Sequence, residues 1–206
     1  MKIFNSKPII KHLQELNAGL VSQVNQLSEE AIVGDDVVSL SERVLIGFKQ
    51  DTLEINFDRQ SIETTTSMEQ VPGSSFTFEY FVEKNKYYSC ANVCYYFKFK
   101  GSSNLLNLSP FGRSLSQAYD VKINGNSFSI CYQTLYSNED LNEDIKNQIK
   151  VFIRNFVDES KFIQEQLNKE LIEYYNSRLN TVKQLILERK SEIVNAKKRD
   201  NDLLDF

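Results

Sequence analysis

The chain has 206 residues and a mass of 23.9 kDa, and 41% of its residues are hydrophobic, so one domain can bury a core of ordinary size. Lys and Arg number 24 against 28 Asp and Glu, and the net charge of -4 excludes a global positive field that would attract nucleic acid or anionic lipid. The N-terminus has no signal-peptide core and no apolar run reaches the length of a membrane span, so we expect a cytoplasmic protein without a membrane anchor.

The helix-breaking residues divide the chain into three zones. All seven glycines and all three prolines lie at or before Gly125, and the part that follows contains neither. Because Gly and Pro mark turns, their absence there predicts a strand followed by long uninterrupted helix. We therefore expect an α+β protein with an N-terminal amphipathic helix in residues 1–36, an antiparallel β domain in residues 37–136, and a long helix or helical hairpin in residues 137–206.

The first zone predicts one helix from about Pro8 to Ala31. Ser6 is in position to cap it, Pro8 falls in the first turn, where proline is tolerated, and Gly34 follows its end. The apolar side chains recur every three or four residues and form one stripe, made of Ile9, Leu13, Leu16, Leu20, Val24 and Leu27. Such a stripe predicts a helix or a sheet as its partner.

The second zone shows the alternation of half-buried strands and predicts about five to seven of them. The strongest pattern is an aromatic hairpin in which residues 76–82 pair with residues 87–100 across a polar turn. Shorter alternating runs lie at 53–57, 121–123 and 128–132. Asn124-Gly125 offers a tight turn between the last two, and the absence of helix-length crossovers favours an antiparallel sandwich or open barrel. Residues 39–50 fit either a helix or a strand.

The third zone carries an apolar stripe with interleaved charges over residues 138–199. The stripe weakens near Asp158-Glu159-Ser160, which predicts a kink or a reversal there. A single helix of this length would extend about 90 Å. Three arrangements therefore stay open: a helix pair folded back near residue 159, a projecting helix that forms a coiled coil with a partner or a second copy, or a helix packed on the N-terminal helix.

The cysteines and the single histidine give little support for a metal site. Cys90 and Cys94 would be about 13 Å apart on one strand, whereas two zinc-bound sulfurs lie about 4 Å apart. We therefore predict structural thiols at Cys90, Cys94 and Cys131, no metal and no cofactor, and we expect no disulfide because the cytoplasm is reducing. His12 lies in the amphipathic helix, and the sequence contains neither a Gly-x-Ser-x-Gly elbow nor a phosphate-binding glycine loop.

One acid and lysine spacing is typical of metal-dependent nucleases. In Asp120-Val121-Lys122 the acid would hold a divalent ion and the lysine would polarise the phosphate. The sequence shows no clear preceding acid on an adjacent strand. We therefore favour Lys122 as an outward strand residue and keep the nuclease as a second alternative.

A loop rich in small residues follows the predicted strand at 87–100. It runs from Gly101 to Ser114, and its small residues leave backbone N–H groups accessible. Lys98, Lys100 and Arg113 add positive charge, so an anion or a nucleotide could bind there with Ser102 as a further ligand. An ordinary connection between strands is the simpler interpretation.

Several C-terminal residues are candidate partner contacts. If the long helix projects, Phe156, Ile163 and Leu167 of its apolar stripe would contact a protein partner or a second copy. The basic residues at Arg189-Lys190 and 197–199 predict a solvated face that complements the helix dipole, with a nucleic-acid contact as the minor alternative.

The tail at residues 200–206 combines acids with apolar side chains. It resembles, in outline, the tips of bacterial single-stranded-DNA-binding proteins and sliding-clamp-binding peptides, whose apolar residues enter a pocket rimmed by basic side chains. This resemblance implies that Leu203, Leu204 and Phe206 dock on a partner. A frayed end, or a cap on the protein's own core, is the simpler interpretation.

The order of elements also resembles a loose class of bacterial proteins. The residues that carry the resemblance are Phe-Lys-Gly-Ser-Ser at 99–103, Ser-Pro-Phe at 109–111, Tyr-Tyr-Asn-Ser-Arg-Leu at 174–179 and Glu-Arg-Lys at 188–190. The class consists of uncharacterised proteins with a β-rich half and a terminal helical half, some encoded near anti-phage or Toll/interleukin-receptor-type signalling genes. The resemblance implies a defence context.

Together these patterns favour a non-catalytic interaction or regulatory subunit of a bacterial assembly. In this hypothesis the β domain recognises a partner and the long helical zone mediates assembly. The alternative is a domain that senses a small anion or nucleotide, and the second alternative is the metal-dependent nuclease.

Overall fold

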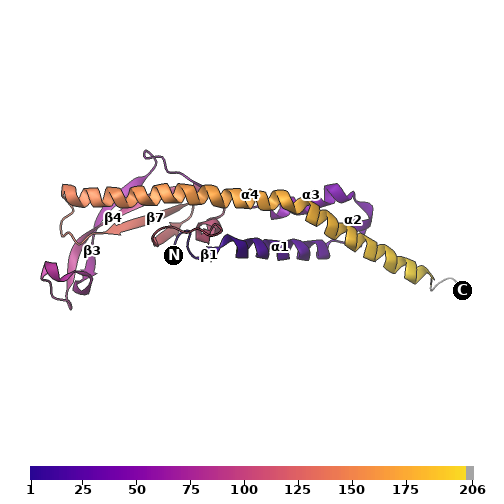
Figure 1. Cartoon of the computed structure of the whole chain (residues 1–206), viewed down its shortest axis with the longest axis horizontal. Coiled ribbons are helices and arrows are strands. Elements are labelled where there is room, and N and C mark those ends of the chain that lie inside the picture. The colour runs from indigo at the N-terminus through magenta and orange to yellow at the C-terminus, as the bar shows by residue number, and fades with distance from the viewer. Residues whose placement is uncertain (203–206) are drawn as a thin grey trace.

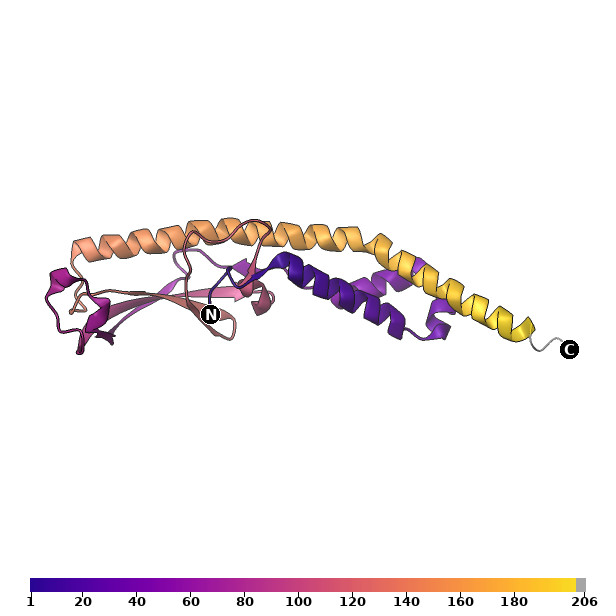
Figure 2. The ribbon, with the colours of Figure 1, turned by 60° about the horizontal axis from the view of Figure 1, so that its bottom comes forward.

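The computed structural model describes residues 1–202 and shows an elongated molecule (Figure 1). A curled antiparallel sheet occupies one end, three shorter helices occupy the other, and one long helix runs along both (Figure 2). The predicted α+β class with an N-terminal helix and a long C-terminal helix is confirmed. The tail residues Leu203, Leu204 and Phe206 lie outside the described residues. No helix within residues 1–202 is long and apolar enough to cross a membrane.

The main sheet has five strands in the order β2-β4-β7-β6, with β3 as a further partner of β4. The strands are β2 (Glu54–Ile55), β3 (Glu63–Pro72), β4 (Tyr87–Lys100), β6 (Val121–Asn124) and β7 (Ser127–Gln133). All neighbours are antiparallel, and β2 and β3 pair with the same edge of β4, opposite residues 99–100 and 87–96 respectively. The predicted turn between the last two strands is present, with Gly125 and Asn126 as its central residues because Asn124 pairs with Ser127, and Gly125 has a φ of 57°.

The predicted aromatic hairpin is right in its second strand and wrong in its first. Residues 87–100 form β4, but residues 76–82 form no strand and contain only a short 3₁₀ turn, η2 (Phe78–Tyr80). On this side β4 pairs with β3, a strand that the sequence pattern does not predict. Because β3 is exposed on both faces over most of its length, it lacks the apolar alternation of a half-buried strand.

The predicted N-terminal helix is two helices, α1 (Ile9–Gln26) and α2 (Glu29–Gly34). Ser28 starts the second, since its hydroxyl accepts a hydrogen bond from the N–H of Ala31 at 3.2 Å. The β zone was predicted to begin at residue 37, but residues 37–48 form helix α3 (Val37–Phe48). Asp36 caps α3 by accepting from the N–H of Ser39 at 2.9 Å, and this bond lowers the pKa of the Asp36 carboxyl.

The long helix α4 (Glu143–Asp202) is continuous, so the predicted reversal near residue 159 is wrong. At this point the helix crosses the loop before β6. The Glu159 carboxylate accepts from the N–H of Ser116 at 2.9 Å, and Ser160 is fully buried. The apolar stripe weakens there because the helix packs against polypeptide backbone.

The first half of α4 covers one face of the sheet. Phe156 is fully buried among Phe97, Tyr119 and Phe128, with ring centroids 5.0–6.2 Å away. Ile163 and Leu167 are 3% and 1% exposed in the same core. The expectation that these three residues contact a partner is therefore corrected, because their own chain already covers them.

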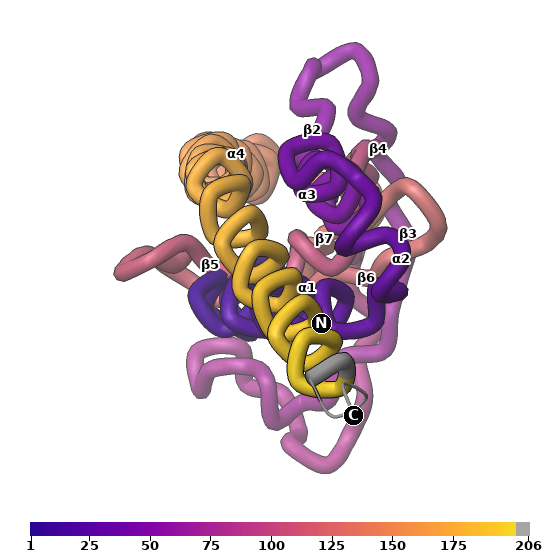
Figure 3. Tube along the Cα trace, turned by 90° about the vertical axis from the view of Figure 1, so that its right-hand side faces the viewer, coloured from indigo at the N-terminus to yellow at the C-terminus, as the bar shows by residue number. Residues whose placement is uncertain are grey.

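The second half of α4 packs along α1, α2 and α3 (Figure 3). Arg189 donates to the carbonyl oxygens of Val24 and Leu27 at the end of α1, and Lys190 donates to Val33 at 3.0 Å in the last turn of α2. These two residues were predicted to lie on a solvated face, and they instead bind carbonyl oxygens at the C-terminal ends of α1 and α2. Of the arrangements left open, packing on the N-terminal helix is the one observed.

The N-terminal residues link the two ends of the molecule. β1 (Lys7–Pro8) pairs in parallel with β5 (Leu108–Ser109), which follows the 3₁₀ turn η3 (Ser103–Asn107). Ile3 and Phe4 are fully buried, and the N–H of Phe4 donates to Leu106 at 2.8 Å. The start of the chain therefore anchors α1 to the sheet.

Candidate interaction surface

Two of the predicted anion-binding residues share a cavity. Lys98 and Lys100 line an open cavity of about 720 Å³ together with Glu54, Ile55, Asn56, Phe99, Asn126 and Ser127. Lys98 lies 3.4 Å from the carboxylate of Glu63, and Glu54 is opposite Lys100 in the strand register. The two lysines are therefore accompanied by two carboxylates, so the local charge is close to balanced.

The other two predicted residues lie away from this cavity. Ser102 does not line it, and the loop that follows crosses to α4, where the N–H of Phe111 donates to Glu170 at 3.0 Å. Arg113 lies over the ring of Phe162, 5.1 Å from its centroid. The structure thus keeps Lys98 and Lys100 together and places Arg113 against Phe162 of α4, outside this cavity.

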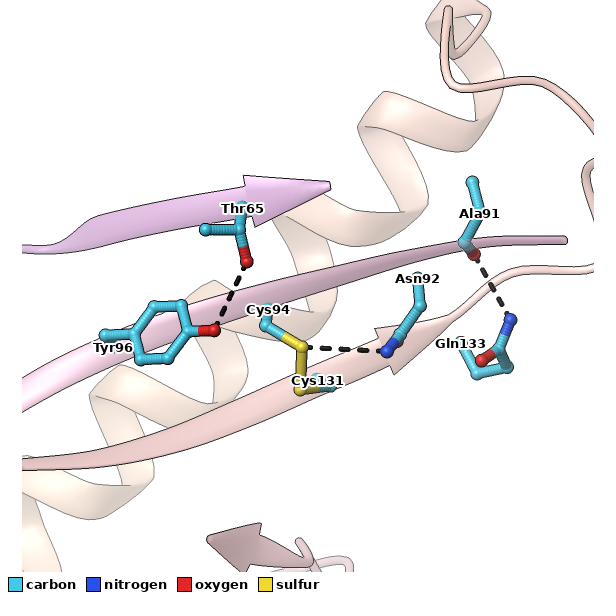
Figure 4. Close-up of a disulfide and its surroundings, with 7 residues drawn as sticks. All are labelled: Thr65, Ala91, Asn92, Cys94, Tyr96, Cys131 and Gln133. Atoms are coloured by element: carbon cyan, nitrogen blue, oxygen red, sulfur yellow. Dashed lines mark hydrogen bonds between the residues drawn. A yellow bond between two sulfur atoms is a disulfide. The ribbon is translucent and has the colours of Figure 1, made fainter. Parts of the chain in front are cut away.

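Cys94 and Cys131 form a disulfide, which corrects the expectation of free thiols (Figure 4). The reason is the register of β4 and β7, which places the two residues directly opposite each other with their Cα atoms 4.0 Å apart. Cys90 is free and buried, and burial raises the pKa of its thiol. The described residues 1–202 hold no cluster of three or more His, Cys, Asp or Glu side chains that could bind a metal ion.

The residues considered for catalysis do not converge. His12 Nε2 shares a hydrogen bond with Gln50 Oε1 at 2.9 Å. Asp120 forms a β-bridge with Lys2, and the side chains of Asp120 and Lys122 are both exposed at the start of β6. His12 lies in α1, whereas Asp120 and Lys122 lie two residues apart at β6, and no hydrogen bond within residues 1–202 joins His12 to either of them.

The most unusual surface is the segment between β3 and β4, residues 73–86, which we call the aromatic loop. It lies at the end of the sheet farthest from the C-terminal end of α4 (Figure 1). Phe78 is 86% exposed and Phe81 is 94% exposed, and the adjacent Tyr87 is 69% exposed. Two phenylalanines in water forgo about 1.5–3 kcal/mol each of burial free energy.

Specific contacts hold the aromatic loop in place. A Cβ on Gly73 would lie 2.1 Å from the carbonyl oxygen of Glu83, so only glycine allows this close approach. The ring of Phe76 packs edge-on against Tyr80 and Tyr88, with centroids 5.4 and 5.3 Å away. The Tyr88 hydroxyl accepts from the N–H of Glu83 at 2.8 Å. The loop is thus anchored by one set of aromatic residues and presents another.

The aromatic loop also contains a strained residue. Phe81 has a φ of 50°, in the left-handed region, where a side chain costs about 1–2 kcal/mol. This conformation ends η2 and precedes the return of the chain toward β4. Because the Phe81 side chain is 94% exposed, it makes no buried contact inside the chain that would offset this cost.

Beside the aromatic loop, β3 has one edge that pairs with β4 and one that does not. Ala91 of β4 exchanges backbone hydrogen bonds with Thr134 and Tyr136 beyond the end of β7, so its N–H and C=O face away from β3. At the other end, Lys98 accepts from Asn56 and therefore faces the side of β2 and β3. Since this direction alternates along a strand, the even-numbered residues of β4 face β3.

The register then shows which groups of β3 face outward. Asn92, Cys94 and Tyr96 are opposite Ser67, Thr65 and Glu63, so the odd-numbered residues of β3 bond to β4. The even-numbered residues direct their N–H and C=O groups outward, and we call these groups of Thr64, Thr66, Met68 and Gln70 the β3 edge. Within residues 1–202, no backbone or side-chain group hydrogen-bonds to the β3 edge.

At the neighbouring strand β2, side chains of α4 bind three of the outward backbone groups. The amide of Asn168 accepts from the N–H of Leu53 at 2.9 Å and donates to its carbonyl oxygen at 2.8 Å. The amide of Gln164 accepts from the N–H of Ile55 at 2.7 Å. Side chains of α4 therefore cover the outer edge of β2 and leave the β3 edge open.

Comparisons of the chain with protein-family models, with curated proteins and with solved structures return no match. The candidate site therefore consists of the aromatic loop and the β3 edge, which the geometry alone identifies.

Proposed function

We propose that this protein is a non-catalytic interaction subunit that presents its aromatic loop to a protein partner. The observation that carries the proposal is the exposure of Phe78 and Phe81 in a loop that the packing of Phe76 against Tyr80 and Tyr88 holds in place. Large exposed aromatic side chains are typical of binding hot spots, where they enter a pocket on the partner. The bacterial defence assembly implied by the sequence resemblance is the setting that we propose for this partner.

The charge of the loop favours a protein over an anionic membrane. Glu79 and Glu83 balance Lys84 and Lys86, and Glu83 forms an ion pair with Lys86 at 2.6 Å. Surfaces that insert aromatic residues into anionic lipid carry an excess of basic residues around them. The long helix also favours a role in presenting the loop to a partner. It contacts the sheet and the three shorter helices and so connects them to the part of the molecule that carries the loop.

Photo-cross-linking from the loop tests this function. A photoreactive phenylalanine analogue replaces Phe81 in one variant and Phe111 in a matched control, both in the protein's own host. Phe111 is 78% exposed but lies elsewhere in the molecule, on the loop bound to Glu170. We expect one protein to cross-link from position 81 and not from position 111.

A binding measurement with the purified cross-linked protein completes the test. The double substitution Phe78→Ser and Phe81→Ser is expected to weaken binding at least about tenfold, whereas Phe111→Ser leaves it unchanged. Equal cross-linking from both positions, or binding that survives the double substitution, would refute a contact role for the loop. Cross-linking to lipid in place of protein would assign the loop to a membrane surface.

A second candidate function is binding of a small anion or nucleotide in the cavity of Lys98 and Lys100. The observation in its favour is that both predicted lysines line one cavity of about 720 Å³. Ligand-dependent thermal stabilisation by a nucleotide, lost in Lys100→Ala, would support this candidate. The absence of any shift with a panel of nucleotides would eliminate it.

A further inference from the structure

We infer that the β3 edge is a docking site for an extended, basic segment of a partner protein. This inference rests on the proposed function and adds the conformation and the charge of the partner. Thr64, Thr66, Met68 and Gln70 offer a row of outward N–H and C=O groups with no partner in the described part of the chain. An extended segment satisfies such a row by adding a strand to the sheet.

The β3 edge lacks the features that usually protect an edge strand against pairing with another chain. Exposed edge strands are commonly blunted by lysine, by internal proline or by a bulge. Between Glu63 and Val71, β3 contains no lysine and no proline, and its register with β4 is unbroken over residues 63–72. Side-chain amides of α4 bind backbone groups at the outer edge of β2, and no such side chain binds the β3 edge within residues 1–202.

The charge of β3 disfavours a second copy of this chain as the partner strand. The charged residues of β3 are Glu63 and Glu69. Lys98 pairs with Glu63 at 3.4 Å, whereas Glu69 is exposed and has no ion-pair partner within residues 1–202. Two β3 strands side by side would bring four glutamates together and no basic residue of β3. A partner with Lys or Arg opposite Glu69 gains a favourable cross-strand pair instead.

The β3 edge is continuous with the aromatic loop. The loop begins at Gly73, directly after Pro72 ends β3. A strand added to the β3 edge therefore reaches the aromatic loop at one of its ends. One partner can engage both surfaces, with backbone hydrogen bonds along β3 and apolar contacts with Phe78 and Phe81.

The test measures amide hydrogen exchange in the full chain with a defined peptide. The probe is a capped peptide of about ten residues in which Lys and Val alternate. We expect exchange at the amides of Thr64, Thr66, Met68 and Gln70 to slow at least about tenfold on binding. The amides of odd-numbered β3 residues, which already bond to β4, should change little.

Two variants separate pairing from other effects. Thr66→Pro removes one outward N–H, which an edge strand tolerates, and should weaken peptide binding at least about tenfold. Thr66→Val keeps the N–H and the branched shape, and should bind like the unchanged protein. Exchange at the odd-numbered β3 residues reports whether the ladder to β4 is intact in both variants.

Three results would overturn the inference. Unchanged exchange at about 1 mM peptide would show that the edge does not accept a strand. Equal slowing by a peptide with Glu in place of Lys would contradict a basic partner. Slowing that rises with protein concentration in the absence of peptide would identify a second copy as the occupant. None of these measurements uses the natural partner, so their failure leaves the cross-linking test of the aromatic loop in force.

Discussion

β2 and β3 pair with the same edge of β4, but their outer edges are treated differently. At β2 and the residue before it, Asn168 of α4 binds the N–H and C=O of Leu53, and Gln164 of α4 binds the N–H of Ile55. The outward groups of β3 receive no such cover within residues 1–202. Since an unpaired N–H or C=O costs little in water and much when buried, β2 belongs to the core and β3 is compatible with solvent or with a partner strand.

The difference separates what stabilises the fold from what is available for binding. α4 packs Phe156 against β4 and β7, and its polar side chains bind the β2 edge. This part of the sheet is therefore covered by the chain itself. β3 and the aromatic loop extend beyond this cover and carry Phe78 and Phe81 in the open. We therefore expect substitutions on the covered side to reduce stability and substitutions on the open side to reduce binding.

The largest effect on the covered side is expected for Phe156→Ala. Phe156 is fully buried where α4 meets the aromatic core of the sheet. Removing a buried phenylalanine side chain should lower the free energy of unfolding by about 3–5 kcal/mol. Phe162→Ala on the same helix is the control, because Phe162 is 42% exposed, and should cost less than about 1 kcal/mol. Similar midpoints in urea for the two variants would contradict the packing of α4 on the sheet.

Loss of the disulfide is expected to have the next largest effect. Cys94 and Cys131 join β4 to β7 and close a loop with a sequence separation of 37 residues. Cys94→Ser with Cys131→Ser, or reduction of the bond, should lower stability by about 2–4 kcal/mol. Denaturant unfolding with and without reductant measures the effect, and the double serine variant must not respond to reductant. A response in that variant would place the reductant-sensitive group elsewhere.

Much of this covered side follows from the sequence. β4 was predicted to the residue because its apolar face, from Val93 to Phe99, alternates with Cys94, Tyr96 and the lysines. The helix α4 was predicted by the absence of Gly and Pro after Gly125. Its supposed reversal was not found, because a weak stripe at Ser160 reflects packing against a loop, which local periodicity cannot distinguish from a turn.

The open side could not be predicted in the same way. β3 is stabilised by its register with β4 and not by a buried face, so its sequence Glu-Thr-Thr-Thr-Ser-Met has no apolar period. Phe76, Phe78 and Tyr80 have such a period but belong to the aromatic loop. Of the predicted ligand residues, Lys98 and Lys100 met in one cavity because they alternate on one strand, whereas the path of the loop to Arg113 depends on tertiary contacts.

A smaller effect is expected when the β2 edge is uncovered. Asn168→Ala removes the amide that both donates to and accepts from Leu53. Leaving partly buried backbone groups without partners should cost about 1–3 kcal/mol. Asn155→Ala is the matched control, because Asn155 is exposed on the same helix, and should change stability by less than about 0.5 kcal/mol. If the two variants unfold at the same denaturant concentration, the cover over β2 does not contribute to stability.

The smallest effect on stability is expected for Thr66→Pro in β3, and Ser67→Pro is its matched neighbour. The N–H of Ser67 faces β4, so proline there removes a ladder bond and should cost more than about 2 kcal/mol. The N–H of Thr66 faces outward, so proline there should cost less than about 1 kcal/mol. Thermal unfolding of both variants measures the difference. A larger loss for Thr66→Pro than for Ser67→Pro would reverse the assignment of the outward groups and remove the basis for strand addition at the β3 edge. The expected order would mean that the β3 edge contributes little to the fold, which leaves its hydrogen-bonding groups available to a partner.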